Sequence, residues 1–272
     1  VFMNKDASIE KANAFIDEAG RDGIELLVFP ESFVPGYPYW GSLYPTADQV
    51  SVNIAFTDAS VEVPGPEIAQ VQAAARAAGV AVVLGVSERL AGTGTCFNSQ
   101  VFIDANGTLL GVHRKLQPTY VERIIWSQGG GSTLSVFDTA VGRVGGLACW
   151  EHTMNLARQA LVEQGQEIHA GAWPGLSAFS GNEHNTVADI QIEAMMRNHA
   201  LTGQTFVIAA GSPVDQVTLD WMTDHLGAQS AVRIGGGWSA VIHPYMQYLA
   251  EPHTGSEEKL IAANIDLDDL KV

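Results

Sequence analysis

Residues 142–161 join a strand pattern to a helix pattern and read GRVGGLACWEHTMNLARQAL. The apolar run 144–148 predicts a buried strand that ends at Cys149, where a helical pattern begins. A cysteine at such a junction faces the unpaired backbone N–H groups of a helix N-terminus, which stabilise a thiolate. The stretch therefore predicts a nucleophilic cysteine on an α/β fold. A lone cysteine is also often a small buried hydrophobic residue, and position alone does not separate the two interpretations.

Helix and strand patterns alternate on both sides of this stretch. Apolar residues at helical spacing predict helices over 9–19, 68–78, 156–162 and 185–202, with Leu156, Ala160 and Val162 marking the third. Apolar runs predict strands at 25–29, 80–88, 100–103, 108–112, 135–137, 144–148, 167–173, 205–210, 238–243 and, last in the chain, 260–266. Turn residues 104–107 predict a hairpin. Most strands are apolar on both faces, so we expect helices to cover mixed sheets.

The composition argues against two classes of partner. Of the 272 residues, 46% are hydrophobic, and the formal net charge is −16. An acidic surface repels phosphate backbones and anionic lipids, so neither nucleic acid nor a membrane is expected as a partner. Only 16% of the residues are charged, which is compatible with surface hidden in subunit contacts. We expect one domain over residues 1–272, because α/β folds of this length are often single.

Cysteine usage and hydropathy predict the compartment. Cys96 and Cys149 could form one disulfide at most, so no disulfide-dense framework is present. No apolar run reaches membrane-spanning length, and no basic-then-apolar leader opens the chain. The expected location is the cytoplasm.

Two charged motifs add to the cysteine. Glu31 follows the strand pattern ELLVFP directly, where partial burial would raise its pKa and make it a usable base. Lys115 lies in GVHRKLQPTYVER, at the end of a hairpin strand, and Glu122 follows seven residues later. If Lys115 points inward, its ammonium group stabilises negative charge that develops on a substrate. The competing interpretations are a solvated loop for Glu31 and a solvated edge strand for the basic run.

The histidines suggest two further interpretations. His152 lies three residues after Cys149, so a Cys–His pair of a thiol peptidase is one alternative. The papain-like sequence around the cysteine is absent. His152, His169 and His184 lack metal-ligand spacing such as H-E-x-x-H, and no metal or organic cofactor is expected.

Three motifs, taken in order, resemble the nitrilase superfamily. They are VFPE with the following PGYPYW, then HRKLQPT with YVER, then GGLACWEH. The resemblance runs from the first helix to the last strand. The forms CWEH, PGYPYW and IHAGAWPG (residues 168–175) are more similar to the nitrilase branch than to the aliphatic-amidase or carbamoylase branches. The chain departs from that branch at Asn155, where Pro is usual, and in the loop 126–132, which lacks the usual acid. From the resemblance, we expect the family's first strand and C-terminal tail to fall outside the sequence given.

The resemblance implies a four-layer α-β-β-α sandwich with mixed sheets and a catalytic Glu31–Lys115–Cys149 triad. Glu122 matches the family's second glutamate and would hold Lys115 and the substrate in place. The implied reaction converts an organic nitrile to a carboxylate and ammonia through a thioimidate and a thioester on Cys149. Lys115 and the backbone N–H of Trp150 would stabilise charge on the nitrogen. Family members pair into homodimers, and many nitrilases form larger homo-oligomers, spirals or filaments.

Aromatic residues near the motifs are candidates for the substrate pocket. We expect Tyr37, Trp150 and Trp173 to bind the substrate, with core packing as the competing interpretation. Aromatic, short aliphatic and cyanide substrates all stay open. Two alternative functions also stay open: an amidase of the same superfamily, and a catalytically silent, filament-forming homologue. The intact triad argues against the silent homologue.

Overall fold

Two mixed β-sheets packed face to face form the centre of the molecule. The computed structural model describes residues 1–179 and 185–271. The first sheet has the strand order β1-β2-β3-β4 and contains β1 (Leu26–Val28), β2 (Ala81–Arg89), β3 (Cys96–Ile103) and β4 (Leu109–Arg114). Strands β1 and β2 are parallel, and the β2–β3 and β3–β4 pairs are antiparallel. The predicted hairpin is confirmed, with Gly107 at a φ of 82° in its turn.

The second sheet contains the strand that ends at Cys149. Its order is β10-β9-β8-β7-β6-β5, with β5 (Phe137–Thr139), β6 (Gly142–Ala148), β7 (Ile168–Trp173), β8 (Phe206–Gly211), β9 (Gly237–Ile242) and β10 (Tyr248–Gly255). Strands β6, β7 and β8 are parallel, and the other pairs are antiparallel. One apolar cluster joins the facing sheets, with Val83 and Phe102 from the first and Ile168 and Phe206 from the second.

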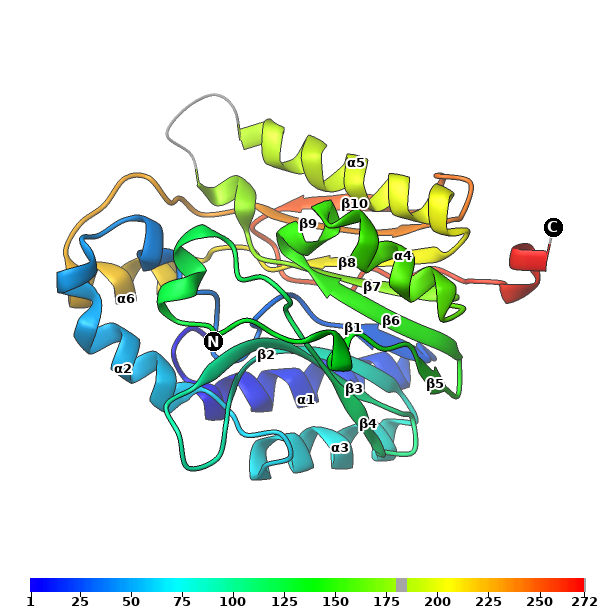
Figure 1. Ribbon diagram of the computed structural model, residues 1–272, viewed down its shortest axis with the longest axis horizontal. Coiled ribbons are helices and arrows are strands. Elements are labelled where there is room, and N and C mark those ends of the chain that lie inside the picture. Colours follow the sequence, from blue (N-terminus) through cyan, green and yellow to red (C-terminus); the bar gives the residue numbers. More distant parts are fainter. Residues whose placement is uncertain (180–184, 272) are drawn as a thin grey trace.

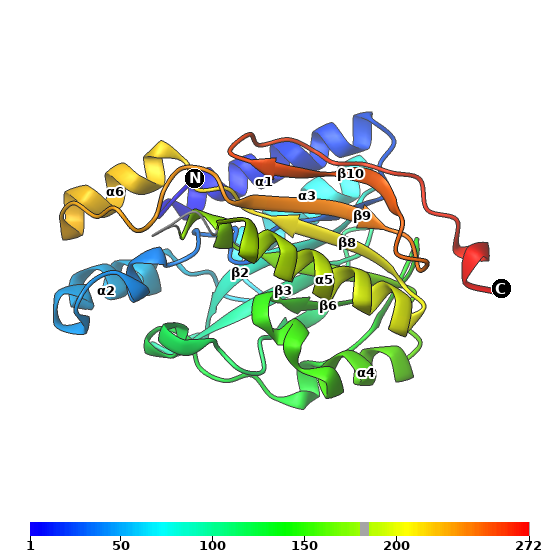
Figure 2. The ribbon, with the colours of Figure 1, turned by 90° about the horizontal axis from the view of Figure 1, so that it is seen from above.

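Helices cover the outer face of each sheet, so the predicted four layers are present (Figure 1). Helices α1 (Lys5–Arg21) and α3 (Pro66–Ala78) cover the first sheet, and α4 (Asn155–Glu163) and α5 (Asn185–Gly203) cover the second. Helices α2 (Val50–Ala59) and α6 (Gln216–Leu226) lie at one end of the molecule in both views (Figures 1 and 2). No helix in the described ranges is long and apolar enough to cross a membrane.

Local sequence explains why the first helix forms where it was predicted. The Asn4 side chain accepts a hydrogen bond from the Ala7 N–H at 3.1 Å and caps the helix. The predicted apolar face of α1, including Ile9 and Ile16, is buried. In α4 the predicted face is wrong, because Leu156 is 85% exposed and Leu161 is buried. Helix α4 follows a 3-10 turn, Cys149–Thr153, and its buried face carries Ala157 and Leu161.

The prediction of the last strand was also wrong. Residues 260–266 run without regular secondary structure, and β10 lies upstream, in the sequence YLAEPHTG. Strand β10 contains Pro252 and several polar residues, so its sequence has no apolar run that would predict a strand. Antiparallel pairing with β9 nevertheless forms it. The apolar residues of 260–266 instead line a cavity of about 490 Å³ beside β1, β8 and β9, and Ile265 also packs against the cluster between the sheets.

Candidate active site

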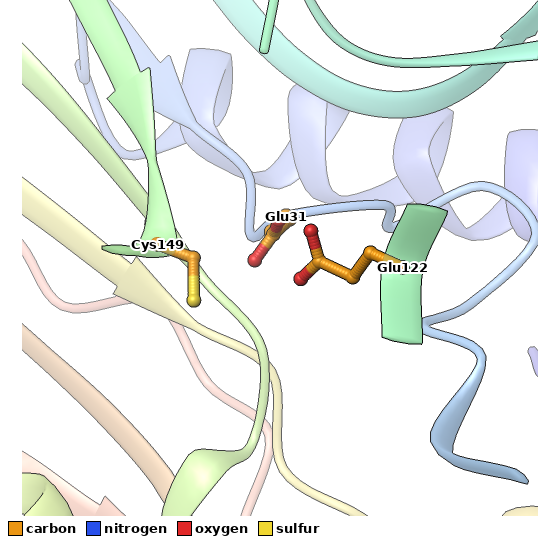
Figure 3. A group of neighbouring side chains, drawn as sticks. All are labelled: Glu31, Glu122 and Cys149. Atoms are coloured by element: carbon orange, nitrogen blue, oxygen red, sulfur yellow. The ribbon is translucent and has the colours of Figure 1, made fainter. Parts of the chain in front are cut away.

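The ends of three strands bring the three predicted catalytic residues together. Glu31 follows β1, Lys115 follows β4 and Cys149 follows β6, while Glu122 lies in a 3-10 turn, Tyr120–Ile124. All four are buried. The Glu31, Glu122 and Cys149 side chains point toward one another (Figure 3), and one polar atom of each lies within 4.8 Å of the others. The solvated interpretations of Glu31 and Lys115 are therefore wrong.

Lys115 lies between the two carboxylates. Its Nζ donates to Glu31 Oε1 at 2.8 Å and to Glu122 Oε1 and Oε2 at 3.1 and 2.8 Å. Burial alone lowers the pKa of Lys115, but the two carboxylates outweigh it and raise that pKa above its ordinary value. The ammonium group is therefore a fixed positive charge. The same two carboxylates and the thiol could ligate a metal ion, but the Lys115 cation already neutralises that position.

Glu31 has the properties of a general base. Burial raises its pKa to about 7, against the opposing effect of Lys115. Its Oε1 accepts from Lys115 and from Asn98 Nδ2, whereas its Oε2 has no hydrogen-bond partner among the described residues. A buried, unpartnered carboxylate oxygen near a thiol can accept the thiol proton.

Cys149 lies at the end of the predicted strand, but its thiol differs from the prediction in its protonation state. The φ of Cys149 is 54°, a left-handed conformation that is uncommon for a non-glycine residue and that turns the chain sharply after β6. Burial and then the Glu31 carboxylate raise the pKa of the thiol well above its ordinary value, despite Lys115 and a hydrogen bond from the Trp150 N–H. A resting thiolate stabilised by a helix end was therefore a wrong expectation, because burial and negative charge dominate here. The thiol needs a base.

Glu151 was missed in the sequence, although it aligns two of the motifs. Its carboxylate accepts from the backbone N–H of Ala148 at 2.9 Å and of Leu116 at 2.7 Å, and it contacts His113 Nε2 at 3.1 Å. Burial alone raises the pKa of Glu151, but His113 and the backbone donors outweigh it and lower that pKa. The strand ends that carry Cys149 and Lys115 are thus tied through one carboxylate. A glutamate beside a cysteine carries no sequence signal for this role.

Two glycines allow close backbone approaches around the site. A Cβ at Gly85 would lie 2.0 Å from the Pro30 carbonyl oxygen, so only glycine lets β2 pass behind the Glu31 turn. A Cβ at Gly129 would lie 2.1 Å from the Arg114 carbonyl oxygen. The glycine loop that departs from the family pattern therefore packs on the backbone next to Lys115.

The remaining predicted residues lie around the same site in different ways. Tyr37 donates from its hydroxyl to Glu122 Oε1 at 2.8 Å. Trp150 is partly buried, and Trp173 is fully buried in an apolar cluster that also contains Cys149. His152 does not pair with the thiol; its Nδ1 lies 2.6 Å from the Cys149 carbonyl oxygen, which removes the Cys–His alternative. Cys96 and Cys149 are both free thiols, so the disulfide option is excluded. His184 lies outside the described residues.

Comparisons with known proteins agree with this geometry. A family model described as carbon-nitrogen hydrolase matches residues 1–272. The chain is 36% identical over 272 residues to a protein named aliphatic nitrilase from Rhodococcus rhodochrous, covering 99% of this chain and 70% of that protein. It is 38% identical over 267 residues to a nitrilase from Paraburkholderia phymatum, covering 98% and 75% of the two chains.

A solved structure supports the fold independently. The carbon-nitrogen hydrolase from Helicobacter pylori superimposes with a TM-score of 0.78 at 21% identity, covering 98% of this chain and 87% of that one. The match over the whole chain agrees with the sandwich and with the motif order read from the residues. The chain belongs to the carbon-nitrogen hydrolase family, the nitrilase superfamily that its motifs resemble, and nitrilases are among its relatives.

Proposed function

We propose that this protein is a nitrilase that hydrolyses organic nitriles to carboxylic acids and ammonia. The observation that carries the proposal is the buried cluster in which Cys149 adjoins a Glu31 carboxylate with one unpartnered oxygen, next to the Lys115 ammonium group. Relatives named nitrilases at 36% and 38% identity support the choice of nitriles as the substrate class.

The first half of the reaction forms the covalent intermediate. Glu31 Oε2 takes the Cys149 proton as the sulfur attacks the nitrile carbon, which forms a C–S bond and converts the triple bond to C=N. The developing negative charge on nitrogen is stabilised by Lys115 Nζ and the Trp150 N–H, and the nitrogen then takes the proton to give a thioimidate. A basic Glu31 and a rigid cation suit these two roles.

The second half releases the products. Glu31 takes a proton from a water molecule that adds to the thioimidate carbon and passes it to the nitrogen. The second proton of that water reaches the nitrogen in the same way as the C=O bond forms, and the carbon–nitrogen bond breaks to release ammonia and leave a thioester. A second water, activated in the same way, cleaves the carbon–sulfur bond and releases the carboxylic acid and the free thiol. The overall balance is one nitrile and two waters to one acid and one ammonia. Glu122 holds Lys115 in place, and Tyr37 donates to Glu122 and borders the same space.

The substrate side chain is expected to lie against Trp150 and Trp173. Both belong to the apolar cluster that contains Cys149, and their rings are 6.4 Å apart in an edge-on arrangement. Apolar walls suit an aliphatic or aromatic R group.

One experiment tests the proposal directly. The protein is assayed for ammonia release with a panel of aliphatic and aromatic nitriles, and each nitrile is paired with its matching amide. A nitrilase releases ammonia from nitriles with higher kcat/KM than from the amides, and the Cys149→Ala variant releases none. Preference for the amides would make the protein an amidase. A folded protein that is silent on both sets, and whose thiols react only as ordinary cysteines, would favour the filament-forming alternative.

Domain and assembly are proposed along with the reaction. Residues 1–272 form one domain in this proposal, since the two sheets share an apolar cluster. A homodimer that assembles into larger oligomers or spirals is supported by apolar side chains on α5, including Ile190 at 61% exposed and Leu201 at 42%. Light scattering after size exclusion measures the mass. Cytoplasmic location stays a prediction.

A further inference from the structure

A buried chain of side chains, with no role in the reaction above, leads to the carbonyl group of Cys149. His152 Nδ1 lies 2.6 Å from the Cys149 oxygen, and His152 Nε2 lies 2.8 Å from His169 Nε2. His169 Nδ1 lies 3.0 Å from Gln166 Nε2, and Gln166 Oε1 lies 3.1 Å from His199 Nε2. All four side chains are buried. We call these four residues, His152, His169, Gln166 and His199, the imidazole chain.

The proton positions in the imidazole chain follow from one fixed acceptor. Burial lowers the pKa of His152 to about 4 and of His199 to about 3, and it lowers the pKa of His169 well below its ordinary value, so all three rings are neutral near pH 7. A neutral ring has one donor and one acceptor nitrogen. The Cys149 oxygen can only accept, so His152 carries its proton on Nδ1.

The remaining bonds then take one direction. His152 Nε2 has no proton and accepts from His169 Nε2–H, so His169 Nδ1 accepts from the amide NH₂ of Gln166. Gln166 Oε1 accepts from His199 Nε2–H. Every donor therefore points toward the Cys149 carbonyl group, and such aligned hydrogen bonds polarise one another.

The carbonyl at the end of the chain belongs to a peptide with a role in the proposed reaction. The Cys149–Trp150 peptide presents its C=O to His152 and its N–H to the Cys149 sulfur. Cys149 holds a φ of 54°, a conformation that persists only where the surroundings fix it. A strong bond on one end of a peptide plane sets where the other end points.

We propose that the imidazole chain, acting through His152, is a positioning device that fixes the Cys149–Trp150 peptide so that its N–H faces the sulfur and the substrate nitrogen. The proposal deepens the nitrilase function and rests on it for the kinetic effect. The direction of the hydrogen bonds in the imidazole chain makes the proposal testable. The side-chain amide of Gln166 sets this direction without contacting the thiol.

The decisive variant is Gln166→Glu, which keeps the shape but removes the donor. An ionised carboxylate accepts from both neighbours, so a neutral His169 moves its proton to Nδ1, and the variant is compared with wild type at high pH, where the new carboxyl group is ionised. His152 then donates from Nε2 to His169 and presents a bare Nδ1 to the Cys149 oxygen. We expect kcat to fall roughly 10- to 100-fold, less than the full loss of an oxyanion donor, with KM changed by less than about threefold. Alkylation of Cys149 by iodoacetamide, which needs no nitrile, should slow as the N–H leaves the sulfur.

Two further variants separate positioning from general damage. Gln70→Glu makes the same charge change on an exposed position of α3 and should leave kcat and alkylation at wild-type values. His152→Asn places an amide donor near the position of Nδ1 without a link to His169, so it should keep most activity. In the His152→Asn background, Gln166→Glu should then have no further effect on kcat. Additive losses in the double variant would overturn the proposal.

A measurement on the wild-type protein decides the case even if Gln166→Glu does not fold. The ¹⁵N chemical shifts of labelled histidine rings identify which nitrogen carries the proton. We expect His152 as the Nδ1–H form and His169 as the Nε2–H form. An Nε2–H form of His152 refutes the chain. If the wild-type protein releases no ammonia from any nitrile while these shifts and the alkylation rates are as expected, the nitrilase function fails and the positioning of the peptide stands.

Discussion

Replacing Glu31 with glutamine should lower kcat strongly and, at the same time, change how stability depends on pH. Oε1 of the amide still accepts from Lys115 and Asn98, but the group that replaces Oε2 cannot take a proton. Loss of a general base lowers kcat by about 10²- to 10⁴-fold, which corresponds to roughly 3–5 kcal/mol in the barrier. Wild-type kcat/KM should rise with pH up to about 7, where Glu31 ionises, and the variant should lack this limb.

The stability effect follows from the same pKa. Burial raises the pKa of Glu31 from 4.5 in the unfolded chain to about 7 in the folded protein. The folded state therefore binds this proton more tightly, and the resulting stabilisation is complete below about pH 4.5 and is lost as pH rises to about 7. At 1.36 kcal/mol per pH unit, the wild-type protein should lose about 3 kcal/mol across this window through Glu31 alone. The glutamine variant should not show this loss.

Urea unfolding, followed by tryptophan fluorescence at about pH 5 and about pH 8, measures the difference. The difference in unfolding free energy between the two pH values is calculated for each protein separately, which removes any pH-independent cost of the unpartnered amide in the variant. The buried histidines contribute equally to this difference in both proteins. Glu10→Gln, on an exposed position of α1, is the matched control and should behave as wild type. The reasoning is refuted if Glu31→Gln and wild type show the same change in unfolding free energy between the two pH values.

Substitutions at four other residues, with Cys96 as a control, test the remaining parts of the site. Cys149→Ala and Cys149→Ser should both end ammonia release in folded protein, because a hydroxyl lacks the nucleophilicity of a thiolate, whereas Cys96→Ala should retain most activity; equal loss at both cysteines would contradict this. Lys115→Arg should lower kcat nearly as much as Lys115→Ala, because a planar guanidinium group does not fit between the two carboxylates as an ammonium group does. A wild-type kcat in the arginine variant would show that only the positive charge matters. Glu151→Gln should lower the unfolding free energy by about 1–3 kcal/mol and lower kcat, because an amide leaves one of three buried donors unpaired; an unchanged Tm would argue against the tie between strand ends. Trp173→Ala should favour bulkier nitriles in kcat/KM if the indole lines the pocket, while an unchanged substrate ratio with a loss of about 3–5 kcal/mol would place it in the core alone.

The sequence marked the three proposed catalytic positions in two ways: each comes at the end of a strand pattern, and the three motifs in order resemble the nitrilase superfamily. Glu31, Lys115 and Cys149 follow these strands, and packing two sheets face to face brings their ends together. The residues that hold this geometry carried no such signal. Glu151 and Asn98 act through contacts with chain segments 35 and 67 residues away, which no local pattern encodes.

The same distinction explains the errors. An apolar segment at 260–266 was predicted as a strand because burial and strand pairing give the same one-dimensional pattern, yet here the apolar residues line a cavity without pairing. The thiolate prediction failed for a related reason. The position of Cys149 at a helix start suggested a lowered thiol pKa. Burial and the Glu31 carboxylate, which lies far from Cys149 in the sequence, instead raise the pKa of the thiol.

Burial of the whole site suits a reaction that moves protons without moving net charge. One ammonium, two carboxylates and one thiol lie together with little exposure, and separating further charge there would be costly. In the proposed reaction the proton that leaves Cys149 passes to Glu31 and then to the substrate nitrogen, so the total charge of the cluster and substrate stays constant through the first half-reaction. Lys115 keeps its proton throughout, because two carboxylates raise its pKa. A fixed cation and one mobile proton are therefore sufficient to run the chemistry in a site that water barely reaches, with Glu31 as the only group whose pKa needs to lie near neutrality.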